Sequence, residues 1–187
     1  MTGGGLCPAV IQPEEAPSPI LTILEYTGLD AHKTNVMRIL EAQAIPYRCM
    51  TYEVEEGNFD GNLVARKLGM DPDSVFKTLV CAGDKGSHIV FCIPVSQELD
   101  MKKAARAARH KRVEMLPLKE LLPLTGYVRG GCSPIGMKKP FPTYIDETAQ
   151  LFDEIAVSAG RRGEQIILAA DSLCTLIGAN YADLTVE

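Results

Sequence analysis

The stretch of the sequence richest in residue types that bind ligands runs from Gly126 to Lys139. It contains glycines at 126, 130, 131 and 136, together with Cys132 and Ser133, and ends in two lysines. Glycine permits positive φ angles and a close approach of the backbone to a ligand, and successive backbone N–H groups can form an anion-binding concavity. The loop therefore indicates either a cradle for an oxyanion, phosphate or carbonyl group, or a tight connection between two strands with solvated lysines.

This loop is not a nucleotide-hydrolysing P-loop. Gly131 and Gly136 have the glycine spacing of G-x-x-x-x-G-K-[ST], but Met137 occupies the lysine position and Lys138 the Ser/Thr position. Without that hydroxyl there is no group to hold magnesium. Nucleotide hydrolysis is therefore not expected.

Lys77 is the strongest single candidate for a catalytic charge. It lies inside the apolar run Val75–Ala82, which is typical of a strand. A lysine there either faces solvent or is partly buried in a pocket, where its pKa falls and its charge can meet an oxyanion. The local pattern alone favours the solvent-facing alternative.

Three other side chains could contact a substrate, and each has an ordinary alternative. Tyr52 could be an amphipathic residue at the edge of the core, and Ser158 a hydroxyl that stabilises the turn after it. Cys132 could be a nucleophile, but the histidines, at 32, 88 and 110, are distant in sequence and no G-x-S-x-G motif occurs. A nucleophile–base pair therefore has no motif support.

A basic stripe is predicted on the helix that Asp100 caps. Its members are Lys102, Lys103, Arg106 and Arg109. Residues 102, 106 and 109 share one helical face, which is either a solvated face or a contact with nucleic-acid phosphates that carries no base specificity. Because the formal net charge is −5, binding to an anionic polymer needs such a local patch. Arg161 and Arg162 could add to it.

The elements that must position these residues follow from hydrophobic periodicity and turn signals. Helices are predicted over 34–43, 62–68, 101–109, 117–126 and 171–177, and strands over 48–54, 75–82, 88–95, 113–116, 143–146, 154–158 and 165–169. Thr34 is the expected N-cap of the first helix, and the glycine-containing turn 83–87 predicts a hairpin. Hairpins mixed with short helices favour an α+β fold with a mostly antiparallel or mixed sheet.

The bulk numbers are those of one globular domain. The chain has 187 residues, of which 46% are hydrophobic and 23% charged. Residues 1–19, rich in glycine and proline, predict a poorly ordered tail, and Ile20–Tyr26 an extra strand or short helix. Neither a membrane span nor a signal peptide is expected. Six isolated cysteines without a C-x-x-C motif favour reduced thiols in a cytoplasmic protein and no metal site.

Taken together, these pieces resemble the YbaK/EbsC family of free-standing editing proteins, related to the insertion domain of bacterial prolyl-tRNA synthetase. The resemblance rests on Thr51–Glu53, Phe76–Leu79, Leu99–Ala105, Val113–Met115, Gly126–Lys139 and Ser158–Gly163, in matching order and spacing. It extends from about residue 34 to residue 184. We therefore expect one editing domain over 31–187 and a partly disordered N-terminal extension over 1–30.

The resemblance implies a compact α+β fold whose mixed, largely antiparallel sheet closes toward a barrel. It also implies hydrolytic removal of a wrong amino acid, chiefly cysteine, from the tRNA for proline. In that family the thiol of the substrate's cysteine is thought to attack the ester carbonyl, and the released thiolactone then hydrolyses. The family's key residue corresponds to Lys77, which would fix the terminal ribose, a phosphate or the ester itself.

The resemblance also assigns binding residues and partners. The expected substrate-site residues are Tyr52, Thr78, Gly130, Gly131, Cys132, Ser133, Ser158 and Gly160. Backbone N–H groups near Gly130 and Gly131 would hold the carbonyl oxygen or the aminoacyl group, and Lys102, Lys103, Arg106 and Arg109 would contact tRNA. The partners implied are aminoacyl-tRNA and, as a second candidate, prolyl-tRNA synthetase, with no cofactor, DNA or membrane.

One departure from the family pattern bears on specificity. Gln165 stands where family members often carry an acidic residue, with Glu164 before it. A polar contact to the substrate is therefore altered, which leaves two alternatives open. One is an Ala-tRNA(Pro) deacylase of the same fold, and the other is a non-enzymatic module that binds an anion or tRNA.

Overall fold

The computed structural model describes residues 33–186, so the predicted tail and the predicted element at Ile20–Tyr26 lie outside the described residues. The helices are α1 (Asn35–Ala42), α2 (Gly61–Leu68), α3 (Met101–Ala107), α4 (Leu118–Thr125) and α5 (Ala170–Ile177). The strands are β1 (Arg48–Thr51), β2 (Phe76–Gly83), β3 (His88–Pro94), β4 (Val113–Met115), β5 (Thr143–Asp146), β6 (Ile155–Ser158), β7 (Glu164–Leu168) and β8 (Asn180–Ala182). No helix within residues 33–186 is long and apolar enough to cross a membrane.

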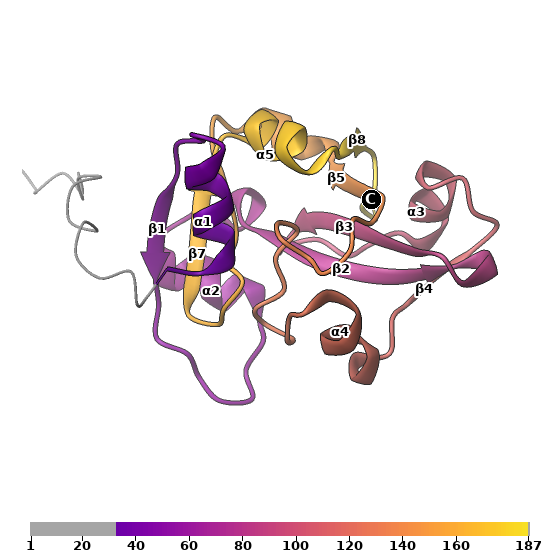
Figure 1. The fold of residues 1–187 in the computed structure, drawn as a ribbon, viewed down its shortest axis with the longest axis horizontal. Helices are drawn as coiled ribbons and strands as arrows, with labels where there is room; N and C mark the ends of the chain where they lie inside the picture. The colour runs from indigo at the N-terminus through magenta and orange to yellow at the C-terminus, as the bar shows by residue number, and fades with distance from the viewer. Residues whose placement is uncertain (1–32, 187) are drawn as a thin grey trace, which may run out of the picture.

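The strands form two sheets (Figure 1). One has the order β1-β7-β6 and is antiparallel throughout. The other has the order β4-β2-β3-β5-β8, in which β5 runs parallel to both β3 and β8. The predicted α+β class with a mixed, largely antiparallel sheet is confirmed.

The expected closure toward a barrel is wrong. The two sheets touch through a parallel bridge between Val75 and Ala156, just before β2 begins. From Phe76 onward β2 pairs with β3 along one edge and with β4 only at its far end, and β6 forms no ladder with β2 beyond this bridge. The sheets therefore remain two open layers that meet at one end of β2.

The β2–β3 hairpin supplies the centre of the fold, as predicted. It pairs from Phe76 opposite Pro94 to Ala82 opposite His88. Strand side chains alternate between the two faces of a sheet. On one face Phe76 and Val80 belong to the main core, and on the other face Cys81 packs in the cluster beneath α3, so both faces are buried. The hairpin therefore has helices or loops on each side.

α1 begins at the predicted N-cap, but its buried stripe differs in part from the predicted set of Val36, Ile39, Leu40 and Ala44, since Ile39 is only partly buried and Ala44 is exposed. The Thr34 side chain accepts a hydrogen bond from the Met37 N–H at 3.3 Å, which caps the helix. Val36, Met37 and Leu40 are fully buried on one stripe and pack into the main core. The helix covers the sheet that contains β1 and β7 (Figure 1).

The ends of two elements and the presence of one additional strand differ from the predictions. β1 ends at Thr51 instead of residue 54, because the chain leaves the sheet after the Tyr52 N–H bonds the Gly163 carbonyl at 2.9 Å. α3 ends at Ala107, and Arg109 has a φ of 58°, which is incompatible with a continuing right-handed helix. β8 is an additional strand, too short at Asn180–Ala182 to show an alternating pattern.

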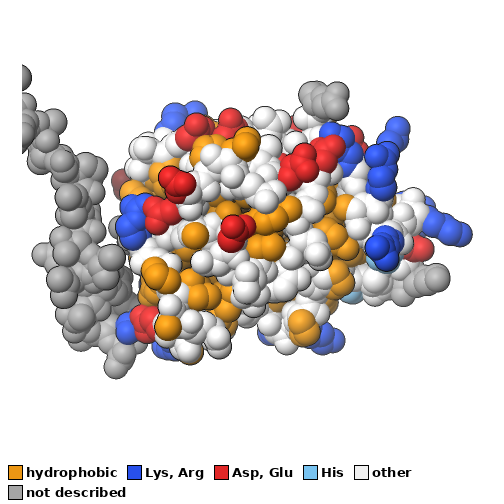
Figure 2. Space-filling model, turned by 90° about the horizontal axis from the view of Figure 1, so that it is seen from above, with side chains coloured by type: hydrophobic (Ala, Val, Ile, Leu, Met, Phe, Trp, Pro, Cys, Tyr) orange, Lys and Arg blue, Asp and Glu red, His pale blue; other side chains and the backbone are white. Residues whose placement is uncertain are grey.

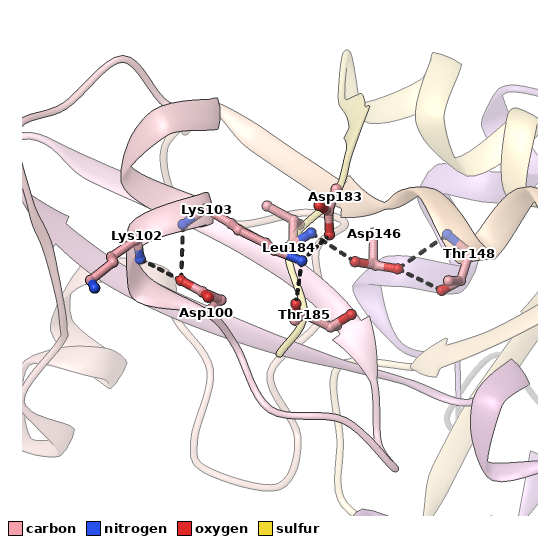
Figure 3. A network of polar contacts seen from close by, with 8 residues as sticks. All are labelled: Asp100, Lys102, Lys103, Asp146, Thr148, Asp183, Leu184 and Thr185. Carbon is pink, nitrogen blue, oxygen red and sulfur yellow. Dashed lines mark hydrogen bonds and ion pairs between the residues drawn. The ribbon is translucent and has the colours of Figure 1, made fainter. Parts of the chain in front are cut away.

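The C-terminal segment is fastened to the rest of the fold by buried and partly buried polar contacts (Figure 3). The Asp146 carboxylate is 1% exposed and accepts hydrogen bonds from the Thr148 N–H at 3.1 Å, the Thr148 hydroxyl at 2.6 Å and the Leu184 N–H at 3.0 Å. The Leu184 carbonyl in turn accepts from the Asp100 N–H at 2.8 Å. A buried charge is thereby satisfied by several donors.

Lys103 completes this network, which we call the C-terminal clasp. Its ammonium lies 2.8 Å from the Asp183 carboxylate and donates to the Thr185 carbonyl at 2.9 Å. Asp100 also caps α3 by accepting the N–H groups of Lys102 and Lys103 (Figure 3). The clasp therefore joins α3, β5 and the last described residues.

Candidate active site

A cavity of about 300 Å³ lies beside the first half of β2. β4 pairs with β2 only over Cys81–Gly83, which leaves Lys77–Leu79 without a strand neighbour on that side. α2, the loop before it and the loop after α4 border this open edge. The cavity brings together six of the predicted residues: Tyr52, Lys77, Thr78, Gly130, Cys132 and Ser158.

Lys77 is half-buried in this cavity rather than facing solvent. Its ammonium donates to the Val95 carbonyl at 3.2 Å and to the Gln97 carbonyl at 2.5 Å. Because an ammonium has three donors, one N–H is left for a ligand. Burial lowers the pKa of Lys77 from its ordinary value, opposed by the nearby charges of Glu98 and Asp60. The lysine is therefore an oriented positive charge in a partly desolvated site.

The glycine loop approaches its neighbours too closely for side chains. Gly130 has a φ of 81°, and a Cβ there would lie 2.8 Å from the Phe59 ring. A Cβ at Gly131 would lie 3.1 Å from the Arg162 backbone nitrogen. The Gly131 N–H donates to the carbonyl of Val128 at 3.0 Å, so the turn already uses this amide. Gly130 borders the cavity, and its role in holding a carbonyl stays a prediction.

The thiols near the cavity are protonated. Burial raises the pKa of Cys132 to about 12 and that of the fully buried Cys92 to about 12. The Thr78 hydroxyl lies 3.9 Å from the Cys92 sulfur. Since the thiolate is the reactive form of cysteine, neither thiol is prepared for nucleophilic attack near neutral pH.

Ser158 and Gln165 lie opposite each other on β6 and β7, and both border the cavity. The Ser158 hydroxyl accepts the Gly160 N–H at 3.2 Å, so it stabilises the turn after β6. The Gln165 side chain is 7% exposed, and its Oε1 has no hydrogen-bond partner within residues 33–186. Leaving a buried acceptor unpaired costs about 1–3 kcal/mol. A donor on the substrate would remove that cost.

The outer edge of the cavity is formed by Phe59, Arg129 and Arg162, which we call the arginine rim. Both guanidinium carbons lie over the Phe59 ring, each 4.7 Å from its centroid. The Arg162 Nε also donates to the Arg129 carbonyl at 2.8 Å. These contacts hold two positive charges beside the cavity entrance.

Comparison with known families decides what kind of site this is. The family model described as the aminoacyl-tRNA editing domain matches residues 61–176, more than half of the chain. The chain belongs to the aminoacyl-tRNA editing domain family. The predicted editing of mischarged aminoacyl-tRNA is thereby confirmed, and aminoacyl-tRNA is the substrate class.

Individual relatives agree with this membership. The editing domain is 48% identical over 155 residues to EbsC of Enterococcus faecalis, named as a candidate Cys-tRNA(Pro)/Cys-tRNA(Cys) deacylase. That match covers 83% of this chain and 94% of the relative. A crystal structure of a candidate trans-editing enzyme for prolyl-tRNA synthetase is 25% identical with a TM-score of 0.69, covering 82% of this chain and 99% of the other. The structure of hypothetical protein APE2540, 20% identical with a TM-score of 0.74, covers 81% and 99% and supports the fold alone.

Three predicted substrate-site residues of the editing domain do not line the cavity. Gly131 and Ser133 are buried within the loop after α4, where the Ser133 hydroxyl accepts the Ile135 N–H at 3.3 Å. Gly160 has a φ of 90°, and a Cβ there would lie 3.0 Å from the Tyr127 ring. These residues shape the loops around the cavity, and direct contact with substrate stays a prediction for them.

The four predicted basic residues lie apart from the cavity. Lys102, Lys103 and Arg106 are on α3, whereas Arg109 follows the end of the helix, so the expected shared helical face is wrong for Arg109. α3 packs through Ala104 and Ala105 against the face of the β2–β3 hairpin that carries Cys81, and none of its residues lines the cavity. Figure 2 shows Lys and Arg side chains gathered at the end of the molecule where α3 lies. Lys102, Arg106 and Arg109 are exposed there, whereas Lys103 belongs to the C-terminal clasp.

Sequence reasoning missed part of the site. It gave no role to Phe59 or Arg129, and it grouped Arg162 with the basic stripe of α3. The available signals were an isolated aromatic residue in an acidic loop and an arginine directly before the Gly130–Gly131 pair. Neither signal says that the two segments meet, since 70 positions separate Phe59 from Arg129.

Proposed function

We propose that this editing domain cleaves Cys-tRNA(Pro) and that the thiol of the mischarged cysteine is the nucleophile. The observation that carries the proposal is the content of the cavity: an oriented, half-buried lysine and, among the lining residues within 33–186, no histidine. Burial raises the pKa of Cys132 to about 12, so its thiol is not in the reactive thiolate form near neutral pH. The cavity orients a substrate and stabilises charge without a ready protein nucleophile.

Among the described residues, three carboxylates line the cavity, and two of them already have polar partners. Asp60 caps α2 by accepting the Asn62 N–H at 2.9 Å, and Glu55 pairs with Lys67 at 2.7 Å. Glu53 is exposed. Since a general base must reach the proton that it abstracts, these contacts favour substrate-assisted attack over water activated by a carboxylate. Glu53 is the residue to test if a water mechanism operates.

The proposed reaction balances without a cofactor. The cysteine thiol loses its proton to solvent, and its sulfur attacks the ester carbonyl carbon. Collapse of the tetrahedral intermediate breaks the bond to the ribose oxygen, which takes a proton, and releases a thiolactone that water opens to free cysteine. The Lys77 ammonium stabilises the negative charge that develops at the ester, and the cavity holds thiol and carbonyl in reacting geometry.

Gln165 orients the amino end of the substrate in this proposal. The α-ammonium group of an aminoacyl ester is a strong donor, and the Gln165 Oε1 is a buried acceptor at the cavity wall. An amide oxygen is an acceptor whose protonation state does not change with pH, and it adds no charge of its own. The substitution of an acidic residue by Gln165 therefore preserves the acceptor.

We further propose that prolyl-tRNA synthetase is a partner that supplies the mischarged tRNA. The support is the similarity to a candidate trans-editing enzyme for that synthetase. Co-purification of the two proteins, and stimulation of editing when the synthetase is added, would test this association.

The test of the function is deacylation of matched substrates. Cys-tRNA(Pro), Ala-tRNA(Pro) and Ser-tRNA(Pro) are compared, since serine is nearly isosteric with cysteine and a pocket separates such pairs by only about 1–3 kcal/mol. We expect rapid cleavage of the cysteine ester, with slow cleavage of the other two. Preferred cleavage of alanine would make the protein an Ala-tRNA(Pro) deacylase, and no cleavage of any ester would leave a binding module.

Two controls separate the possible nucleophiles. Cys132→Ala should retain most activity, because the buried thiol is protonated and has no base. Alkylating the thiol of the charged cysteine should block cleavage. If the alkylated ester or Ser-tRNA(Pro) is cleaved efficiently, the nucleophile is water or a protein group, and substrate-thiol attack is wrong.

A further inference from the structure

The arginine rim has the chemistry of a phosphate site. Each guanidinium carbon lies 4.7 Å from the centroid of the Phe59 ring. Apart from the Arg162 Nε, which donates to the Arg129 carbonyl, the N–H groups of the two guanidinium groups have no hydrogen-bond partner within residues 33–186. The N–H edge of arginine is the part that binds phosphate oxygens in a bidentate manner. Phe59, Arg129 and Arg162 are all exposed to solvent, so the edges are accessible from outside the cavity.

The charges of the rim are not balanced within the described part of the protein. In residues 33–186 no carboxylate lies within ion-pair distance of Arg129 or Arg162, whereas Lys67, Lys103 and Arg161 all have such partners. Because each guanidinium carbon lies 4.7 Å from the same ring centroid, the two carbons are within about 10 Å of each other. This separation is close to the Debye length at physiological salt, which is about 8 Å. Two positive charges held this near each other raise the positive potential at the rim and favour the binding of an anion there.

The backbone also keeps the rim open. Gly130 lies between Arg129 and the cavity, and any Cβ at this position would meet the Phe59 ring. A side chain at position 130 would push the Phe59 ring away from the loop. The observed arrangement of the ring, both guanidinium groups and the cavity wall therefore requires glycine at 130. The Arg162 bond to the Arg129 carbonyl fixes the two loops relative to each other.

We propose that the arginine rim binds the phosphate on the 5′ side of the terminal nucleotide of the aminoacylated tRNA. This proposal rests on the proposed function, since the aminoacyl ester would occupy the cavity at Lys77. In an aminoacyl-tRNA the ester and this phosphate are attached to the same ribose. One cavity lined by Lys77 and bordered by both arginines matches that arrangement. The rim, rather than α3, thus positions the acceptor end.

The decisive experiment compares two small substrates that differ by one phosphate. These are the cysteinyl esters of adenosine and of adenosine 5′-monophosphate, assayed with wild type and with the Arg129→Gln, Arg162→Gln double variant. We expect wild type to prefer the phosphorylated ester by about tenfold or more in kcat/KM, as charge-assisted hydrogen bonds produce. The double variant should lose this preference and cleave the two esters at equal rates. Equal preference for the phosphorylated ester in both proteins would overturn the proposal.

A binding measurement keeps the proposal testable if neither ester is cleaved. Fluorescence anisotropy follows a short uncharged RNA ending in C-C-A, over a series of salt concentrations. Loss of one phosphate contact should reduce the salt slope by about 0.7 in the rim variant. Arg129→Lys with Arg162→Lys should bind with intermediate affinity, because charge remains but the bidentate edge is lost. Unchanged affinity and slope in the glutamine variant would exclude a phosphate at the rim, whatever the outcome for catalysis.

Discussion

Two basic regions lie in different parts of this molecule and differ in construction. On α3, Lys102 and Arg106 project from one short helix into solvent, Arg109 is exposed just beyond the end of that helix, and Lys103 forms an ion pair with Asp183. The arginine rim draws its charges from two loops and holds both against one aromatic ring beside a cavity. α3 lies at one end of the molecule, and the loop that carries Phe59 lies near the other (Figure 1).

The difference shows that charge density is a poor guide to a binding site. Exposed lysines on a helix are flexible and fully hydrated, so each contributes little to affinity. Guanidinium groups fixed on a ring lose little freedom when an anion arrives, because their geometry already exists. We therefore expect the cavity and its rim to dominate the reaction, with α3 giving a minor, salt-dependent contribution.

Lys77→Ala should have the largest effect. Removing a charge that stabilises a transition state costs about 10²–10³ in rate, and Lys77 is the charge oriented in the cavity. The variant should still bind uncharged tRNA, since the rim and α3 are unchanged. Single-turnover deacylation and anisotropy would measure the two properties. Wild-type turnover would show that Lys77 is not catalytic, whereas a large loss of thermal stability would make it a structural residue.

Gln165→Leu should have the next largest effect on the cavity. It removes the acceptor proposed for the substrate ammonium, and leaving that donor unpaired costs about 1–3 kcal/mol in kcat/KM. The unfolding midpoint should stay the same or rise, because the unpaired buried acceptor disappears. Gln165→Glu is the matched control, since it keeps an acceptor. A fall in both stability and activity would mean that Gln165 supports the fold and does not contact substrate.

The pH profile distinguishes the charge in the cavity from charges on α3. Activity should rise about tenfold per pH unit as the substrate thiol ionises below its pKa of about 8.5. It should fall again as Lys77 loses its proton, and burial places that descending limb below pH 10.5, the ordinary pKa of lysine. The measurement is kcat/KM corrected for uncatalysed ester hydrolysis. A descending limb at or above pH 10.5 would show that Lys77 is not the titrating group.

The smallest effect is expected on α3. Lys102→Gln with Arg106→Gln should change the KM for charged tRNA by less than about threefold, because exposed charges at the low end of their usual range contribute only about 0.2 kcal/mol each. Lys103 is left intact, since it stabilises the clasp. A change as large as that of the rim double variant would reverse the comparison, and α3 would then be a principal tRNA contact.

The local elements of the fold could be predicted from sequence, whereas their assembly could not. Thr34, Gly69 and Gly126 mark helix ends because each supplies a cap or a left-handed residue. The open edge of β2 could not be anticipated, because it depends on how few residues β4 pairs with. β8 carries too short a pattern to be recognised.

The candidate site, like the fold, could be predicted from the sequence only in part. Residue type and motif identify Lys77 and the glycine loop. The sequence pattern around Lys77 favours a solvent-facing side chain, and only the neighbouring carbonyls of Val95 and Gln97 explain its burial. Phe59 and Arg129 could not be joined from sequence, because a contact between distant loops leaves no periodic signal.

The C-terminal clasp has a consequence for how this domain can be cut and transplanted. A fragment ending at residue 176, where the family match stops, would lack β8 and residues 183–186. Asp146 would lose the Leu184 N–H, and the Asp100 N–H would lose its acceptor. β5 would become an unpaired edge able to recruit a second copy. The unit that folds here therefore extends beyond the segment that the family model matches, and a fusion joining this domain to another protein should place its junction after residue 186.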